Sequence, residues 1–179
     1  MQFLHIFHEK FVLVIAIFET IVYNETNCGN IGMPPAVPSR LHRKEIFNNM
    51  YTAKDIRNIA LLGHGGDGKS ALCESMLYLT KAITRLGKRA DGTTVSDFDD
   101  EEKKRQYSIK TSVIPVEYAG CKLNVLDNPG YFDFAAEVVQ SLRVADAGLI
   151  CLSAKSGIVV GTEKGWKSLA DAELPAMFY

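Results

Sequence analysis

The sequence of 179 residues has no excess of charge of either sign. Its 20 Lys and Arg residues stand against 21 Asp and Glu, which gives a formal net charge of -1 at pH 7. Such a balance gives no global indication of nucleic-acid binding, although a local basic patch remains compatible with it. We therefore expect no DNA partner.

Cysteine is also scarce. Cys28, Cys73, Cys121 and Cys151 stand far apart in the sequence and form no CxxC pair. This usage is typical of reduced thiols, mostly buried, in a cytosolic protein. Zinc ligation is the alternative, but the four histidines are not spaced with the cysteines as zinc ligands usually are: His5, His8, His42 and His64.

No apolar run is long enough to cross a bilayer. The run at residues 11–18 has eight apolar residues, whereas a spanning helix needs about 20, so we expect no membrane partner. It is closer to the core of a signal peptide, but only Lys10 provides positive charge before it, and no small-residue cleavage site follows promptly.

Residues 1–49 differ in character from the rest of the chain. The Gly- and Pro-containing stretch at 29–38 breaks regular structure and is typical of a linker. We expect these 49 residues to be a non-native extension in front of a start at Met50. A disordered or loosely docked tail and a targeting segment remain open. Residues 50–179 are then the predicted domain.

What is present is an ordinary globular composition, with 47% hydrophobic and 23% charged residues. The apolar run at residues 56–62 predicts a buried strand. Behind it, Leu72, Met76, Leu79 and Ile83 recur at helical spacing and predict a helix.

Between that strand and that helix lies a glycine-rich stretch, residues 63–70, called here the phosphate loop. It reads Gly63-His64-Gly65-Gly66-Asp67-Gly68-Lys69-Ser70 and fits GxxxxGKS at every fixed position. Such a loop lets backbone N–H groups converge on phosphate oxygens, with Lys69 reaching the β and γ phosphates and Ser70 offering its hydroxyl to Mg2+. The alternative is a plain glycine turn that caps a helix, which the flanking strand and helix disfavour.

Downstream, residues 85–106 have no apolar period and predict a long mobile loop, with the charged run 97–105 on a solvated face. Residues 109–118 and 121–126 predict a hairpin. A helix containing Ala135 and Leu142, a strand at 148–152, a helix at 163–172 and a strand at 176–179 should follow. Because the chain stops within that strand, we expect it to be an N-terminal fragment.

The hairpin leads into Asp127-Asn128-Pro129-Gly130, called here the DxxG turn. At the end of a strand it is what a nucleotide switch requires. Asp127 can hold Mg2+ through water, and the Gly130 N–H can sense the γ phosphate. Alone, the tetrapeptide would be merely a good turn, but its place after the phosphate loop favours the switch.

Residues 51–179 resemble the GTP-binding domain of translational GTPases, above all bacterial elongation factor G in its divergent elongation-factor-G-like branch. The resemblance rests on strings longer than the two motifs: Ile56-Arg57-Asn58-Ile59, Gly63-His64, residues 127–134 and residues 137–148. It implies an α/β P-loop fold in which helices flank a mostly parallel sheet, truncated before the guanine-recognition motif. It also implies GTP or GDP with Mg2+ as ligands.

The sequence departs from the family's usual pattern in three regions. The family's first switch usually reads arginine-glycine-isoleucine-threonine-isoleucine, and here it reads Arg105-Gln106-Tyr107-Ser108-Ile109. Ser108 could still offer a hydroxyl to Mg2+. Tyr131 stands where a catalytic histidine is usual. Gly65 and Gly66 replace an apolar residue and an aspartate.

The resemblance implies a cytoplasmic GTPase that acts on the ribosome, contacting rRNA and ribosomal proteins and coupling GTP hydrolysis to tRNA and mRNA movement. A ribosomal protection protein and a GTP-dependent binding switch with little turnover are the alternatives. A P-loop ATPase or kinase is more remote.

Overall fold

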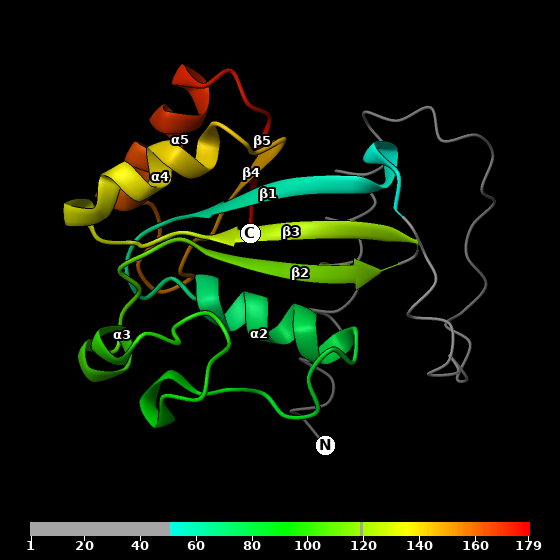
Figure 1. The fold of residues 1–179 in the computed structure, drawn as a ribbon. Coiled ribbons are helices and arrows are strands. Elements are labelled where there is room, and N and C mark those ends of the chain that lie inside the picture. Colours follow the sequence, from blue (N-terminus) through cyan, green and yellow to red (C-terminus); the bar gives the residue numbers. More distant parts are fainter. Residues whose placement is uncertain (1–50, 119) are drawn as a thin grey trace. The chain divides into compact units, whose positions relative to one another are not determined.

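The computed structural model describes residues 51–118 and 120–179 (Figure 1). The predicted extension at 1–49 lies outside the described residues, and so does Cys28. The chain divides into two units, Met1–Lys54 and Asp55–Tyr179. The sheet and its covering helices belong to the second unit.

One five-stranded sheet forms the centre of this unit, in the order β2-β3-β1-β4-β5. Its strands are β1 (Ile56–Leu62), β2 (Ser112–Tyr118), β3 (Cys121–Asp127), β4 (Ala147–Ile150) and β5 (Ala176–Phe178). All neighbours pair in parallel except β2 and β3, which form the predicted antiparallel hairpin. The predicted mostly parallel sheet is thus confirmed.

Helices cover both faces of the sheet. The helices of the described residues are α2 (Lys69–Leu79), α3 (Asp100–Arg105), α4 (Ala135–Leu142) and α5 (Val160–Asp171), with one-turn 3-10 helices η1 (Ala53–Asp55), η2 (Arg89–Asp91) and η3 (Phe132–Phe134). Figure 1 shows α2 on one face and α4 with α5 on the other. Within the described ranges, no helix has the length and apolar character needed to cross a membrane.

The second half of β1, residues 59–62, is buried on both faces, which explains why all four residues there are apolar. Ala60 and Leu62 belong to a cluster with Leu142 of α4 and Leu169 of α5. Because side chains alternate along a strand, the buried Leu61 points to the opposite face, which α2 covers. The two layers of core fix β1, and with it the start of the phosphate loop.

The predicted helix behind the phosphate loop ends earlier than its apolar spacing indicated, so Ile83 lies outside it. The Thr80 hydroxyl donates to the Met76 carbonyl at 2.9 Å, and Lys81 takes a left-handed conformation with φ 61°. A residue with positive φ cannot continue a right-handed helix. The helix therefore stops at Leu79.

The predicted long loop at 85–106 is interrupted by two short helices. The stretch between α2 and β2, called here the α2–β2 segment (residues 80–111), contains η2 and α3. Asp99 and Glu102 form a capping box that starts α3. Asp97 and Glu102 are each only 2% exposed, so the charged run is not wholly a solvated face.

Candidate functional site

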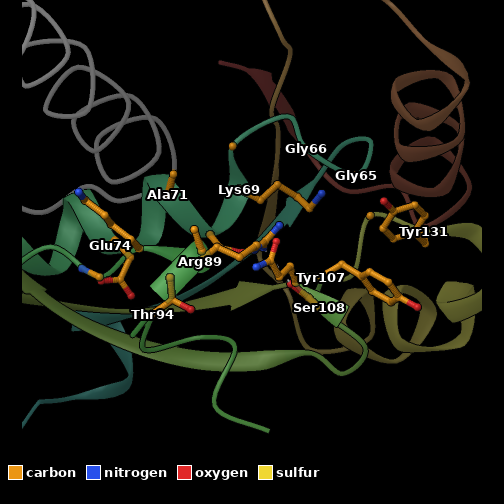
Figure 2. Close-up of a pocket in the computed structure, with 17 residues that line it drawn as sticks. Gly65, Gly66, Lys69, Ala71, Glu74, Arg89, Thr94, Tyr107, Ser108 and Tyr131 are labelled. Atoms are coloured by element: carbon orange, nitrogen blue, oxygen red, sulfur yellow. Dashed lines mark hydrogen bonds between the residues drawn. The ribbon is translucent and has the colours of Figure 1, made fainter. Parts of the chain in front are cut away.

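The carboxyl ends of β1 and β3 bring the two predicted motifs together. Leu61 pairs with Asp127 in the parallel register, so the phosphate loop and the DxxG turn leave the sheet side by side. A cavity of about 520 Å³ lies between these motifs and the α2–β2 segment, and Figure 2 shows Lys69, Arg89 and Tyr131 around it. The cavity lies at the carboxyl ends of the strands, where open α/β sheets usually bind ligands.

The phosphate loop folds back on itself. Gly63, Gly66 and Gly68 have positive φ, which a residue with a side chain rarely adopts. The Asp67 carboxylate accepts a hydrogen bond from the His64 N–H at 2.8 Å. Gly68 is the N-cap of α2, so the positive end of that helix adjoins the cavity.

Lys69 lies across the loop and is only 6% exposed. Its Nζ donates to the carbonyl oxygens of Gly63 at 3.0 Å and His64 at 2.9 Å. Burial lowers the pKa of Lys69, and the nearby Asp127 carboxylate opposes that shift. The loop thus holds the Lys69 ammonium group at the cavity through carbonyl oxygens, and no carboxylate of the described residues accepts a hydrogen bond from this group.

Asp127 is the most unusual acid of the site. It is 1% exposed, and neither carboxylate oxygen has a partner in hydrogen-bonding geometry among the described residues. Burial raises the pKa of Asp127 to about 6, and the Ser70 hydroxyl and the Lys69 cation lie near enough to oppose this rise. A buried carboxylate without partners is costly unless a cation or water satisfies it.

The Asp127 carboxylate and the Ser70 hydroxyl fit the predicted Mg2+ site. An oxygen-lined site with a free carboxylate beside a serine hydroxyl has the ligands that Mg2+ prefers, and this ion usually keeps several waters. Within 51–118 and 120–179 there is no group of three or more His, Cys, Asp or Glu side chains suited to a metal. Nucleotide oxygens and water would have to complete the coordination.

Ser70 and Ser108 contact the same side chain, Arg89, which was not predicted from the sequence as a site residue. Arg89 Nη2 donates to Ser70 Oγ at 2.7 Å and lies 3.4 Å from Ser108 Oγ. Its Nε donates to Asp97 Oδ2 at 2.9 Å, and Ser108 donates to Asp97 Oδ1 at 2.7 Å. No local pattern marks Arg89 or Asp97, because the partners are 8 to 19 residues apart in sequence.

Gly130 closely approaches the phosphate loop. A Cβ at this position would lie 2.5 Å from Lys69 Nζ and 2.6 Å from the Gly65 backbone nitrogen. Only glycine fits there without movement of the backbone. The DxxG turn is therefore in direct contact with the loop that carries the lysine.

Tyr131 packs over Gly65. A Cβ on Gly65 would lie 3.1 Å from two carbons of the Tyr131 ring, and the ring centroids of Tyr107 and Tyr131 are 4.8 Å apart. Tyr131 is 44% exposed. The two departures from the family's usual residues, at 65 and 131, are thus one packing feature in which the missing side chain makes room for the ring.

The predicted site residues do not all reach the cavity. Eight of them line it: Gly65, Gly66, Gly68, Lys69, Ser70, Ser108, Gly130 and Tyr131. Six others are not part of its lining: Gly63, His64, Asp67, Asp127, Asn128 and Pro129. Asn128 is fully buried, donates to the Leu61 carbonyl at 3.1 Å and accepts the Thr111 hydroxyl at 2.8 Å. Its contacts are those of a residue that fastens the DxxG turn to the sheet.

Three buried or partly buried glutamates hold the α2–β2 segment in place, and none of them was predicted from the sequence. Glu74 accepts the Gly87 N–H at 2.9 Å, Glu102 accepts the Ile109 N–H at 2.8 Å, and Glu137 accepts the Thr111 N–H at 2.9 Å. These bonds also explain why β2 begins at Ser112 rather than at 109, as predicted. The capping box could have revealed Glu102.

The buried cysteines do not line the cavity. Cys73 and Cys151 are buried free thiols, and Cys121 is half-buried. Burial raises the pKa of Cys151 to about 12 and that of Cys73 well above its ordinary value. Thiols held protonated in this way are poor nucleophiles.

Comparison with known proteins agrees with this geometry. The family model described as "Elongation factor Tu GTP binding domain" matches residues 54–179. The "Elongation factor G-like protein" of Mycobacterium tuberculosis is 38% identical over 120 residues, covering 67% of this chain and 17% of the relative. The mitochondrial "Ribosome-releasing factor 2" of Candida dubliniensis is 36% identical over 132 residues, covering 74% of this chain and 16% of the relative.

Solved structures agree as well. The crystal structure of ttk003000868 from Thermus thermophilus superposes with a TM-score of 0.67 at 41% identity, covering 69% of this chain and 19% of that one. A bacterial selenocysteine-specific elongation factor shares the fold, with a TM-score of 0.55 at 18% identity, covering 68% of this chain and 19% of its own. The chain thus spans less than a fifth of the length of these relatives and structures. It belongs to the family of elongation factor Tu GTP binding domains, the nucleotide-binding domain of translational GTPases.

Proposed function

We propose that this chain binds GTP and GDP with Mg2+ and hydrolyses GTP as part of an elongation-factor-G-like protein that acts on the ribosome. The observation that carries the proposal is the contact between the two motifs. Gly130 of the DxxG turn lies against Gly65 and Lys69 of the phosphate loop. A γ phosphate held by the loop would meet the N–H of the turn, which is the arrangement of a nucleotide switch.

The chain's own residues have distinct tasks in this mechanism. The phosphate loop and the start of α2 bind the phosphates through N–H groups, and Lys69 leaves the carbonyls of Gly63 and His64 to meet the terminal phosphates. Ser70, Ser108 and Asp127, the last through water, would hold Mg2+, which neutralises charge on the phosphates. Tyr131, at the edge of the cavity, would orient the attacking water through its hydroxyl.

Tyr131 predicts slow turnover. A tyrosine with a pKa of about 10 stays neutral near pH 7, whereas a histidine with a reference pKa of about 6.5 can carry a positive charge. A cationic group contributes a factor of about 10³ to 10⁵ in related phosphoryl-transfer enzymes. The protein should therefore bind GTP normally and hydrolyse it more slowly on ribosomes than a histidine-bearing relative.

The decisive experiment measures nucleotide binding and single-turnover hydrolysis in the full-length protein. Lys69→Ala should lower GTP affinity at least about tenfold, the factor expected for a buried charge-assisted hydrogen bond. Equal affinities would refute the phosphate site. Ribosome-stimulated hydrolysis by the wild type, Tyr131→Phe and Tyr131→His then tests the role of Tyr131. If the wild type matches a histidine-bearing relative and Tyr131→Phe changes nothing, catalysis does not pass through this residue.

Translocation in the cytoplasm is the role that we propose for the whole protein. A role in ribosome release is a second candidate, because three Candida and Lodderomyces relatives are named mitochondrial ribosome-releasing factor 2. A binding switch with little turnover would follow if ribosomes failed to stimulate hydrolysis. Ribosomal protection would follow if ribosomes stimulated hydrolysis and the protein released a bound drug without moving tRNA. Translocation and ribosome-splitting assays with purified ribosomes separate these roles.

A further inference from the structure

Arg89 occupies the oxygens that the proposed metal site needs. Its Nη2 donates to Ser70 Oγ at 2.7 Å and lies 3.4 Å from Ser108 Oγ. These are the two hydroxyls predicted to ligate Mg2+. The side chain comes from η2, far along the chain from the phosphate loop, and points into the cavity beside Lys69 (Figure 2).

Asp97 anchors Arg89 in this position. The carboxylate is 2% exposed. One oxygen accepts the Arg89 Nε at 2.9 Å, and the other accepts the Ser108 hydroxyl at 2.7 Å. Arg89 is thus bound through its fork to both a buried carboxylate and the phosphate loop. Two bonds from one rigid guanidinium lose less side-chain entropy than two independent contacts would.

The contact between Arg89 and Ser70 is incompatible with ligation of a metal by Ser70. Magnesium binds oxygen at about 2.0 to 2.1 Å, whereas the guanidinium nitrogen already lies at hydrogen-bonding distance from that oxygen. A guanidinium is permanently charged, so it would repel a divalent ion at this distance. Arg89 cannot be neutralised to make room, and it must move.

We propose that Arg89 is a tethered cation that competes with Mg2+ for the Ser70 and Ser108 hydroxyls and partly replaces the charge of the ion toward the nucleotide phosphates. The inference rests on the proposed nucleotide site. Arg89 contributes positive charge to the cavity when the metal is absent and opposes the metal when it is present. Nucleotide affinity therefore depends less on Mg2+ than it would without Arg89.

The measured quantity is the ratio of GDP affinity at saturating Mg2+ to GDP affinity in EDTA, obtained by calorimetry on the full-length protein. This ratio is the coupling between metal and nucleotide, which acts equally in both directions. Arg89→Gln should raise the ratio at least about tenfold, as expected for one hydrogen bond from a charged group. Arg89→Lys, which keeps the charge but loses the fork, should give an intermediate ratio.

Two further variants make the result interpretable. Arg143→Gln, an exposed arginine in the turn after α4, is the matched control and should leave the ratio unchanged. Asp97→Asn removes the anchor of Arg89 and should raise the ratio in the same direction, so the test survives if Arg89→Gln fails to fold. Thermal unfolding identifies such a failure.

The inference is overturned if the wild type and Arg89→Gln give equal ratios. It is also overturned if Arg89→Gln unfolds at the wild-type temperature yet loses GDP in both conditions, because Arg89 would then be a direct, metal-independent phosphate ligand. If the wild type itself binds no GDP with or without Mg2+, the proposed function fails, and that outcome differs from both of these.

Discussion

The packing of Tyr131 on Gly65 predicts a measurable coupling between the two positions. A Cβ on residue 65 would lie 3.1 Å from the Cε2 and Cζ atoms of the Tyr131 ring. Gly65 is not among the residues with positive φ, so alanine can adopt its backbone conformation without strain. The ring contact is therefore the main cost of the Gly65→Ala substitution.

The magnitude follows from two opposing terms. Overpacking costs about 1 to 3 kcal/mol, and the lower end applies because the Tyr131 ring is 44% exposed and can tilt away. Replacing glycine by alanine at a compatible position gains about 0.4 to 1 kcal/mol by restricting the unfolded chain. The two terms nearly cancel in the wild-type background. In a Tyr131→Ala background only the gain remains, so the coupling energy is about 1 kcal/mol.

The assay is a double-mutant cycle by scanning calorimetry on the full-length protein. The transition of this domain is the one whose midpoint rises with GDP, since a ligand stabilises the state that binds it. For a domain of this size, a change of about 1 kcal/mol corresponds to about 4 °C in the midpoint. Gly65→Ala combined with Val144→Ala, an exposed residue beyond α4, is the control cycle and should be additive.

Additivity of Gly65→Ala and Tyr131→Ala within about 0.3 to 0.5 kcal/mol, the usual range for independent sites, would refute the argument. So would an equal loss of stability from Gly65→Ala in both backgrounds. Either result would mean that the ring does not hold its place over the loop in solution.

Three further predictions concern Asp127, Glu102 and Gly130. The pKa of Asp127, raised to about 6, means that the native state holds this proton more tightly than the unfolded chain, so stability falls as the pH rises from about 4 to 6 and stays low above it. At about pH 7.5, Asp127→Asn should raise the unfolding temperature of the nucleotide-free protein, through a gain of up to about 3 kcal/mol in the free energy of unfolding. It should also flatten the dependence of that free energy on pH. A wild-type stability that is already constant between about pH 4 and 6 would contradict this. Glu102→Ala removes the acceptor of the Ile109 and Lys110 amides, so their hydrogen exchange should quicken at least about tenfold; unchanged exchange, measured by mass spectrometry, would show that the carboxylate is dispensable. The Cβ of Gly130→Ala has no room beside the phosphate loop, so the loop should be displaced. A displacement that costs about 1.4 kcal/mol or more lowers GDP affinity, measured by calorimetry, at least about tenfold. An unchanged, wild-type affinity would show that the turn moves instead.

The parts of the fold that could be predicted from sequence are those set by local pattern. The apolar run of β1, the glycine loop and the DxxG turn each depend on neighbouring residues, and the parallel sheet then brings them together through the pairing of Leu61 with Asp127. The hairpin strands β2 and β3 were predicted from alternation and a turn for the same reason.

The α2–β2 segment could not be predicted in this way. Its course depends on acceptors distant in the chain, such as Glu74, which binds the amide of Val95 21 residues later. Nothing in the sequence indicates that the charged residues Glu74 and Asp97 are buried. Asn128 shows the same limit, because nothing in the DxxG motif indicates that its side chain bonds Leu61 and Thr111.

The glutamates that hold the α2–β2 segment bind its backbone and not its side chains. Glu74, Glu102 and Glu137 all accept from main-chain N–H groups, which every residue except proline possesses. At positions 109 and 111 the course of the segment is therefore insensitive to which amino acid donates, and a proline would be the harmful replacement. Position 87 requires glycine, because a Cβ there would collide with the Thr93 carbonyl oxygen. A segment whose sequence departs from the family's usual pattern, as at Gln106 and Tyr107, can still place the hydroxyl of Ser108 at the cavity. The scaffold thereby leaves the chemistry of this stretch free to diverge while its shape is kept.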